Sequence, residues 1–183
     1  MDQKNSKEII QNKESKLNSS KRSSIYNLIL AVKYLDMRLD ALKSEDEMEV
    51  LLNLQELNRD LLVATDQLAE DINCQHLIKQ LVELLNKFYL PDITMNAIIC
   101  LNALLDINPM FTSTIIKYGG IIKILETMSQ NIEYIDIAES AIKGIEKISF
   151  ENPFVLLEND AFCMILNFIE FFELGLRVNS KVK

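Results

Sequence analysis

The sequence predicts an all-α protein, an α-solenoid of stacked helical repeats that coil as a right-handed superhelix. Three observations indicate this class. The 183-residue chain is 49% hydrophobic with only four Gly and three Pro, which allows a sizeable core and argues against a turn-rich β fold. Apolar residues recur at helical spacing from Ile25 onward. Part of that apolar pattern then repeats along the chain.

Residues 1–24 differ from the rest of the chain in composition and charge. They hold six Lys and Arg against three Asp and Glu, a net charge of +3, so the total of −8 leaves −11 for residues 25–183. Because this segment is rich in Lys, Ser and Asn, we predict a disordered basic tail. The remaining residues lack the clustered Lys and Arg that phosphate contacts need, so we expect no nucleic-acid partner.

Helical elements follow this tail in order. Periodic apolar residues predict a helix from Ile25 to Leu42, and "KSEDEME" reads as a solvated turn and an acidic helix start. The string "VLLNLQELNRDLLV" continues as a helix, "ATDQLAEDINCQ" reads as a looser connection, and "HLIKQLVELLNKF" has one apolar face. No apolar stretch reaches the roughly 18 residues of a membrane span, so we expect no membrane partner.

A 44-residue offset relates two parts of the chain. Residues 74–109 align without a gap to residues 118–153, pairing Asp92 with Asp136, Ala97 with Ala141 and Pro109 with Pro153. The preceding helices follow the same offset, with Ile78, Lys79, Leu81 and Leu84 opposite Ile122, Lys123, Leu125 and Met128. A period near 44 lies in the range of about 40–47 for armadillo and HEAT units. We therefore predict an armadillo/HEAT-type solenoid over residues 25–183, with copies near 26–73, 74–117 and 118–160 and a partial copy at 161–183.

Particular residues within the copies have predicted local roles. Asp136 precedes a periodic apolar run and is predicted as an N-cap, with Glu139 completing a capping box. Gly144 takes the place of Cys100 in the other copy, and two small residues there predict close approach of a neighbouring helix. Bends are predicted at "KYGG", residues 117–120, and at "ENDA", residues 158–161.

One string also resembles a known family. "IEYIDIAESAIKGIEKISFENPFVLLENDAFCMILNFIEFFE" is similar to the armadillo-repeat segment of the KAKTUS-like, ubiquitin-fusion-degradation class of HECT-type E3 ubiquitin ligases. The "IEYIDIAE" helix start, "GIEKIS" before an "NP" turn and the closing "FIEFFE" carry the resemblance, which runs from about Tyr26 to Arg177. It implies a substrate- or partner-recognition segment. Asn159, Asp160 and Ala161 depart from the Ala-Gly-Gly of the family.

We expect no catalytic residue, metal or cofactor in this chain. None of Cys74, Cys100 or Cys163 lies in the Leu-Pro…Thr-Cys setting of the family's thioester cysteine, and the 183 residues contain no HECT catalytic lobe. Cys100 and Cys163 fall in apolar helical runs and are predicted to be small core residues. Cys74 and His76 alone cannot form a tetrahedral metal site. An odd number of widely spaced cysteines fits reduced thiols, so we expect a cytoplasmic or nuclear protein.

The predicted binding surface is the ladder of third helices, which is the concave face in solenoids of this kind. The candidate protein-binding residues, placed away from the apolar stripe, are Lys79, Glu83, Asn86, Lys123, Thr127, Gln130, Phe168 and Phe171. The final helix also carries Ile165, Leu166, Ile169 and Phe172 with little sequence after it to cover them. We expect further repeats, a second copy of the chain or a partner to cover that edge.

These observations leave two functions open, with a third less favoured. The first is a non-catalytic protein-interaction segment of a HECT-type E3 ubiquitin ligase, and the second is a free-standing armadillo scaffold or adaptor. A small helical enzyme is the third. The expected partners are proteins of the ubiquitin pathway, and self-association through the last helix is a further hypothesis.

Overall fold

A computed structural model describes residues 37–62 and 74–181, with side chains described as far as Phe171. Arg38–Lys183 forms one of two compact units of the chain, and the other, Met1–Met37, lies outside the described residues except for Met37. The predicted tail over residues 1–24 therefore lies outside the described residues. So does much of the predicted copy over residues 26–73.

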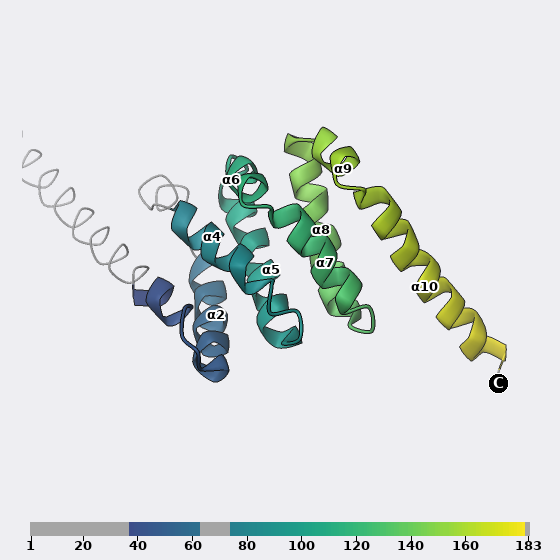
Figure 1. Cartoon of the computed structure of the whole chain (residues 1–183), viewed down its shortest axis with the longest axis horizontal. Coiled ribbons are helices and arrows are strands. Elements are labelled where there is room, and N and C mark those ends of the chain that lie inside the picture. Colours follow the sequence, from purple (N-terminus) through teal and green to yellow (C-terminus); the bar gives the residue numbers. More distant parts are fainter. Residues whose placement is uncertain (1–36, 63–73, 182–183) are drawn as a thin grey trace, which may run out of the picture. The chain divides into compact units, whose positions relative to one another are not determined.

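The described residues are helical, with no strand among them, which confirms the all-α prediction (Figure 1). A short helical turn at residues 37–41 precedes the labelled helices. These are α2 (Glu47–Leu62), α4 (Cys74–Leu84), α5 (Pro91–Ile107), α6 (Phe111–Lys117), α7 (Gly120–Gln130), α8 (Ile135–Glu151), α9 (Phe154–Glu158) and α10 (Ala161–Lys181).

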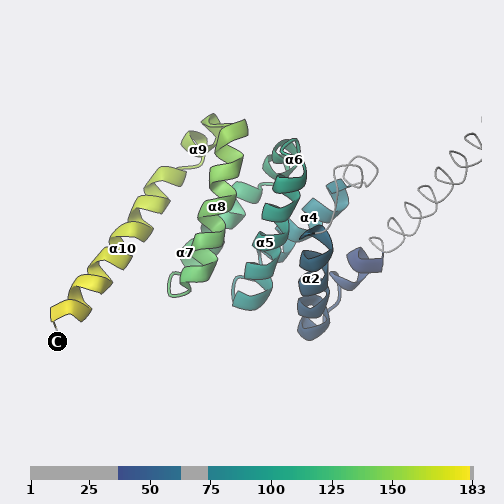
Figure 2. The same cartoon turned by 180° about the vertical axis from the view of Figure 1, so that it is seen from behind.

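The helices follow one another in a long, short, long order that defines the repeat. We call α2, α5 and α8 the first helices, α6 and α9 the second helices, and α4, α7 and α10 the third helices. First helices stack on one another, α2 on α5 and α5 on α8, while α4 packs on α5 and α7 on α8. Figures 1 and 2 show this succession from opposite sides. The fold is an α-solenoid.

A continuous apolar core runs between the first and third helices. Its members are aliphatic residues with almost no exposed surface, and burying each one stabilises the fold by roughly 1.5–3 kcal/mol. The core includes Leu54, Leu57, Leu77, Ile78, Leu81, Ile98, Leu101, Leu104, Ile124, Leu125, Ile145 and Ile148. Because α5 packs against α2 on one side and α8 on the other, it is apolar over most of its circumference.

The 44-residue offset holds for the first helices. Helices α2, α5 and α8 begin at Glu47, Pro91 and Ile135, each 44 residues after the last. Their buried positions repeat at the same interval, as at Leu57, Leu101 and Ile145.

The predicted offset is wrong for the third helices, where burial repeats every 43 residues. Ile78, Leu81 and Leu85 of the α4 segment are buried, and so are Ile121, Ile124 and Met128 around α7. The 44-residue alignment instead pairs buried Ile78 with Ile122, which is 48% exposed. The two offsets differ because the connection from Met128 to Ile135 is one residue longer than the connection from Leu85 to Pro91.

The predicted N-cap at Asp136 is also wrong. Helix α8 begins at Ile135 after Tyr134, no side chain caps it, and Asp136 lies within its first turn. There the carboxylate favours the helix through the dipole instead of through a capping hydrogen bond. Glu139 does not complete a capping box, since its Oε1 accepts from Lys143 Nζ at 2.7 Å.

The two predicted bends are confirmed by the backbone. Gly119 before α7 has φ 73°, and Asp160 before α10 has φ 52°. Glycine adopts this left-handed conformation without strain, and Asp tolerates it better than most residues. These equivalent bends establish that Ala161 of α10 corresponds to Gly120 of α7, an offset of 41 residues.

Candidate interaction surface

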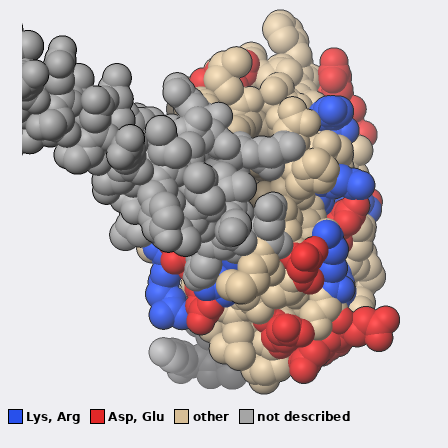
Figure 3. Space-filling view, turned by 90° about the vertical axis from the view of Figure 1, so that its left-hand side faces the viewer, with Lys and Arg blue, Asp and Glu red and all other residues tan. Residues whose placement is uncertain are grey.

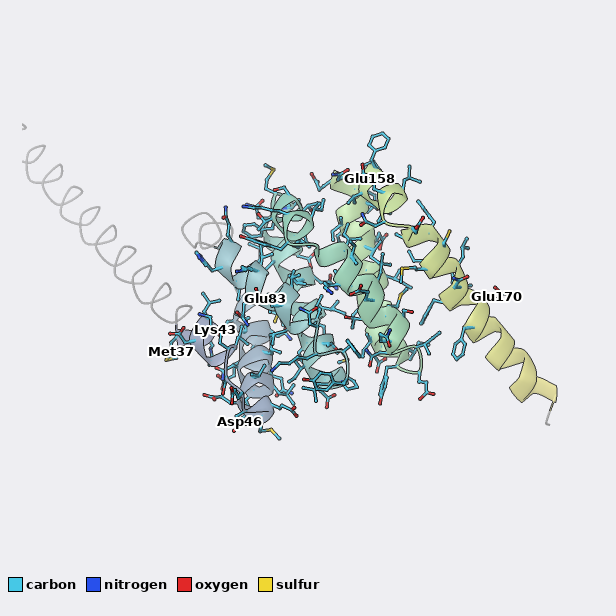
Figure 4. All side chains as sticks on the ribbon, in the orientation of Figure 1. Met37, Lys43, Asp46, Glu83, Glu158 and Glu170 are labelled. Carbon is cyan, nitrogen blue, oxygen red and sulfur yellow. The ribbon has the colours of Figure 1, made fainter. Side chains whose placement is uncertain are left out.

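The exposed side of α4 and the turn that follows it carry three of the predicted binding residues. Lys79, Glu83 and Asn86 are all exposed, as expected for positions away from the apolar stripe. Lys79 Nζ lies 3.6 Å from Glu83 Oε1, one helical turn away. A pair this exposed adds little to stability, so both charges are available to a partner. Figure 4 labels Glu83 among the side chains of this face.

The exposed side of α7 differs from the prediction at one residue. Gln130 is exposed and Lys123 is half-buried, with its Nζ 2.9 Å from Glu126 Oε2. Thr127, however, is 0% exposed and cannot contact a partner. Ile122 and Glu126 are exposed there instead, and the alignment by sequence missed them.

The burial of Thr127 follows from the 43-residue offset. In that register Thr127 corresponds to buried Leu84, whereas the 44-residue alignment places it opposite exposed Glu83. Its Oγ1 donates to the backbone oxygen of Leu85 at 3.4 Å, and Asn131 Nδ2 donates to that of Phe88 at 3.1 Å. These two hydrogen bonds link α7 to the end of the preceding third helix.

The last third helix, α10, also differs from the prediction. Phe171 is exposed, but Phe168 is only 8% exposed and packs inward. Phe168 corresponds to buried Thr127 when α7 and α10 are aligned at the 41-residue offset. Phe162, Leu166 and Ile169 of α10 are also exposed. The sequence reasoning assigned Leu166 and Ile169 to the uncovered edge but missed Phe162, which the bend at Asp160 would have indicated.

The cysteines give no indication of an activated nucleophile. Burial raises the pKa of the Cys74 thiol to about 11 and raises that of Cys100 further, so neither is a thiolate at neutral pH. Cys163 is exposed on α10, which corrects its prediction as a core residue.

No cluster of three or more His, Cys, Asp or Glu suited to a metal ion occurs within residues 37–62 and 74–171. Among the helices described, none is long and apolar enough to cross a membrane.

Charge on the described surface is of both signs. Figure 3 shows acidic and basic side chains interspersed on one side of the molecule, with acidic groups gathered along one edge. Of the described cationic residues, Lys43, Lys79, Lys123, Lys143 and Lys147 each lie within 4 Å of a carboxylate. The described surface carries polar side chains of both charge signs together with exposed apolar side chains, several of them on α10.

The fold defines a helical-repeat protein, an α-solenoid of stacked helices. A family described as "E3 ubiquitin-protein ligase TRIP12-like, TPR repeats" matches residues 2–158, and the chain belongs to that family. It is 30% identical over 143 residues to the E3 ubiquitin-protein ligase UPL3 of Arabidopsis thaliana, covering 76% of this chain. It is 28% identical over 127 residues to the E3 ubiquitin-protein ligase UPL4 of the same plant, covering 69% of this chain.

The matched regions form a small part of both relatives. The alignments span 7% of the length of UPL3 and 8% of the length of UPL4. No solved structure matches the chain. These comparisons confirm the resemblance to the repeat region of E3 ubiquitin ligases.

Proposed function

We propose that this chain is a non-catalytic protein-recognition segment of a HECT-type E3 ubiquitin ligase, working in the cytoplasm or nucleus. Its membership of the TRIP12-like repeat family carries the proposal. Both relatives are E3 ubiquitin ligases by name, and the chain matches only 7–8% of each. The two buried cysteines, with raised pKa values, support a role outside catalysis.

The contact surface in this proposal is the exposed side of the third helices. It includes Lys79 and Glu83 on α4, Asn86 in the turn after α4, and Lys123, Glu126 and Gln130 on α7. Neighbouring third helices are joined by the Thr127 and Asn131 hydrogen bonds, so the two sets of side chains are held in a fixed spacing. A fixed array reduces the ordering entropy that a partner must overcome on binding.

A fusion to a HECT catalytic domain tests the recognition role. We expect the full 183-residue chain, joined to an isolated HECT domain, to direct ubiquitin onto proteins in a lysate that the domain alone leaves unmodified. Reversing charge on the surface, with Glu83→Arg and Glu126→Arg together, should remove those products. Identical products from all three proteins would refute the proposal.

Thioester formation tests the non-catalytic role separately. The purified chain, mixed with charged ubiquitin-conjugating enzyme, should form no adduct with ubiquitin that a thiol reductant cleaves. An adduct that disappears in a Cys163→Ser variant would overturn this part of the proposal. The free-standing scaffold remains the alternative, and a mature transcript that encodes no HECT domain would favour it.

A further inference from the structure

One apolar stripe on α10 occupies positions that are buried on the other third helices. Aligned by the bends before α7 and α10, Phe162, Leu166 and Ile169 correspond to Ile121, Leu125 and Met128. On α7 these positions are 2%, 1% and 1% exposed, whereas on α10 they are 51%, 63% and 52% exposed. The same positions on the α4 segment, Ile78, Val82 and Leu85, are buried too.

The difference lies in what covers each third helix. Helix α5 packs along α4, and α8 packs along α7, whereas α10 packs mainly against α9 and α7 (Figure 1). The inward half of α10, which includes Ala161 and Phe168, is already buried. Helix α10 therefore has the packing face of a third helix, and none of the first helices among the described residues lies along it.

Charge around the stripe indicates what can cover it. Residues 148–176 contain no Lys or Arg, and the stripe is flanked by the exposed residues Glu158, Asp160 and Glu170. Figure 4 shows Glu158 on α9 and Glu170 on α10. Antiparallel pairing of α10 with a second copy would place Asp160 near Glu170 of that copy, and like charges there oppose self-association. The described first helices α2, α5 and α8 are already packed in the stack.

We propose that Phe162, Leu166 and Ile169 form a docking face for an amphipathic helix of a partner protein, with an aliphatic stripe flanked by Lys or Arg. This helix lies along α10 as α5 lies along α4, and its anchors follow the i, i+3, i+4, i+7 spacing of helix-in-groove recognition. The inference stands apart from the ligase role, because it rests on the burial and charge around α10.

Peptide binding to the full 183-residue chain tests the proposal. The probe is a labelled peptide with the sequence of α8, residues 135–151, carrying Glu139→Lys and Glu146→Lys. Helix α8 covers the equivalent stripe on α7, and both substituted positions are exposed there. We expect saturable binding in fluorescence anisotropy. The unsubstituted α8 peptide should bind more weakly. The difference in affinity between the two peptides should decrease as salt is added, because salt screens the added charges.

Two matched variants locate the site. Leu166→Asp places a charge in the stripe, and Leu157→Asp makes the same change on α9 at a Leu of equal exposure, 64% against 63%. Leu166→Asp should weaken binding about tenfold or more, while Leu157→Asp should leave it unchanged. Circular dichroism melts check that both variants remain folded.

Three outcomes would overturn the proposal. The first is no saturable binding of the Lys-substituted peptide. The second is equal loss of binding in the two variants. The third is a wild-type chain that sediments as a dimer and becomes monomeric with Leu166→Asp, because a second copy would then be the occupant of the stripe.

Discussion

At the scale of single residues, the contact between α5 and α8 depends on a glycine. A Cβ atom added at Gly144 would lie 2.5 Å from Asn102 Oδ1, so any larger residue requires this amide to shift. Asn102 Nδ2 donates to the backbone oxygen of Ser140 at 2.8 Å. One repeat earlier, Cys100 replaces the glycine and its Sγ lies 3.0 Å from Asn58 Oδ1. The small residues predicted for close helix approach are confirmed at both positions.

We expect Gly144→Ala to lower the free energy of unfolding by about 1 kcal/mol. Ala improves helix propensity by about 1 kcal/mol, but overpacking against Asn102 costs about 1–3 kcal/mol. Urea denaturation measures the change. In an Asn102→Ala background the same substitution should stabilise the fold, because the opposing amide is gone. A loss of equal size in both backgrounds would show that Asn102 is not the cause.

We also expect a pH dependence from Cys74. Burial raises its pKa to about 11, above the value of about 8.5 for an unfolded thiol. Between these values the unfolded chain loses the proton and the folded chain keeps it, so stability falls as pH rises from about 9 to 11. Urea midpoints across this range should fall less steeply in a Cys74→Ala variant. If the urea midpoints of the wild type and of Cys74→Ala fell equally steeply with pH, Cys74 would not be the cause of the pH dependence.

Thiol alkylation gives an independent measure of cysteine burial. At pH 8, iodoacetamide should modify exposed Cys163 in the folded chain, while buried Cys74 and Cys100 should react only after unfolding. Peptide mass spectrometry identifies the modified sites. Modification of Cys100 at the rate of Cys163 in native protein would contradict the packing between α2 and α5.

At the scale of elements, the offset of the third helices decides which side chains a partner can contact. A 44-residue offset leaves position 127 on the surface, and the 43-residue offset buries it. The connection before α8 contains the extra residue, so helix length and apolar spacing alone do not reveal the shift. The burial of Thr127 and of Leu84, its equivalent at the shorter offset, establishes the 43-residue offset.

Thr127→Glu tests the offset directly. We expect it to destabilise the chain by about 3 kcal/mol or more, because it buries a carboxylate without a partner. Gln130→Glu adds the same charge at an exposed position of the same helix and should change stability by less than about 0.5 kcal/mol. Thermal and urea unfolding give both values. If Thr127→Glu and Gln130→Glu both changed stability by a small and equal amount, the 44-residue alignment of α4 and α7 would be supported instead.

At the scale of the whole unit, stability depends on contacts between neighbouring helices, as in other stacked repeats. Helix α5 lies between α2 and α8 and also contacts α4, whereas α10 contacts mainly α9 and α7. The apolar stripe of α10 is open to solvent. Local opening should therefore cost least at the α10 end of the described helices.

Hydrogen exchange measures this gradient. We expect amides of α10 to exchange faster than those of α5 and α8 under native conditions. Adding the Lys-substituted α8 peptide should slow exchange in α10 and leave α5 unchanged, because the peptide covers only the last third helix. Uniform protection along the chain without peptide would contradict the gradient.

Local patterns in the sequence predicted the helical elements and the 44-residue interval between first helices. The same patterns led to the family, which the comparisons confirm. These features could be predicted because the 3.6-residue period and the bends at Gly119 and Asp160 depend on neighbouring residues alone. The boundaries of the four predicted copies and the right-handed superhelix stay predictions.

Tertiary structure decided which residues of each third helix meet solvent. Thr127 and Phe168 are buried, and Phe162 is exposed, because exposure depends on which helix packs alongside and on a one-residue change in a connection. Apolar spacing marks the faces that can be buried, but it does not show which of them a neighbour covers. Apolar periodicity predicted the helical elements and the stripes, and packing between helices established which residues stay exposed to a partner.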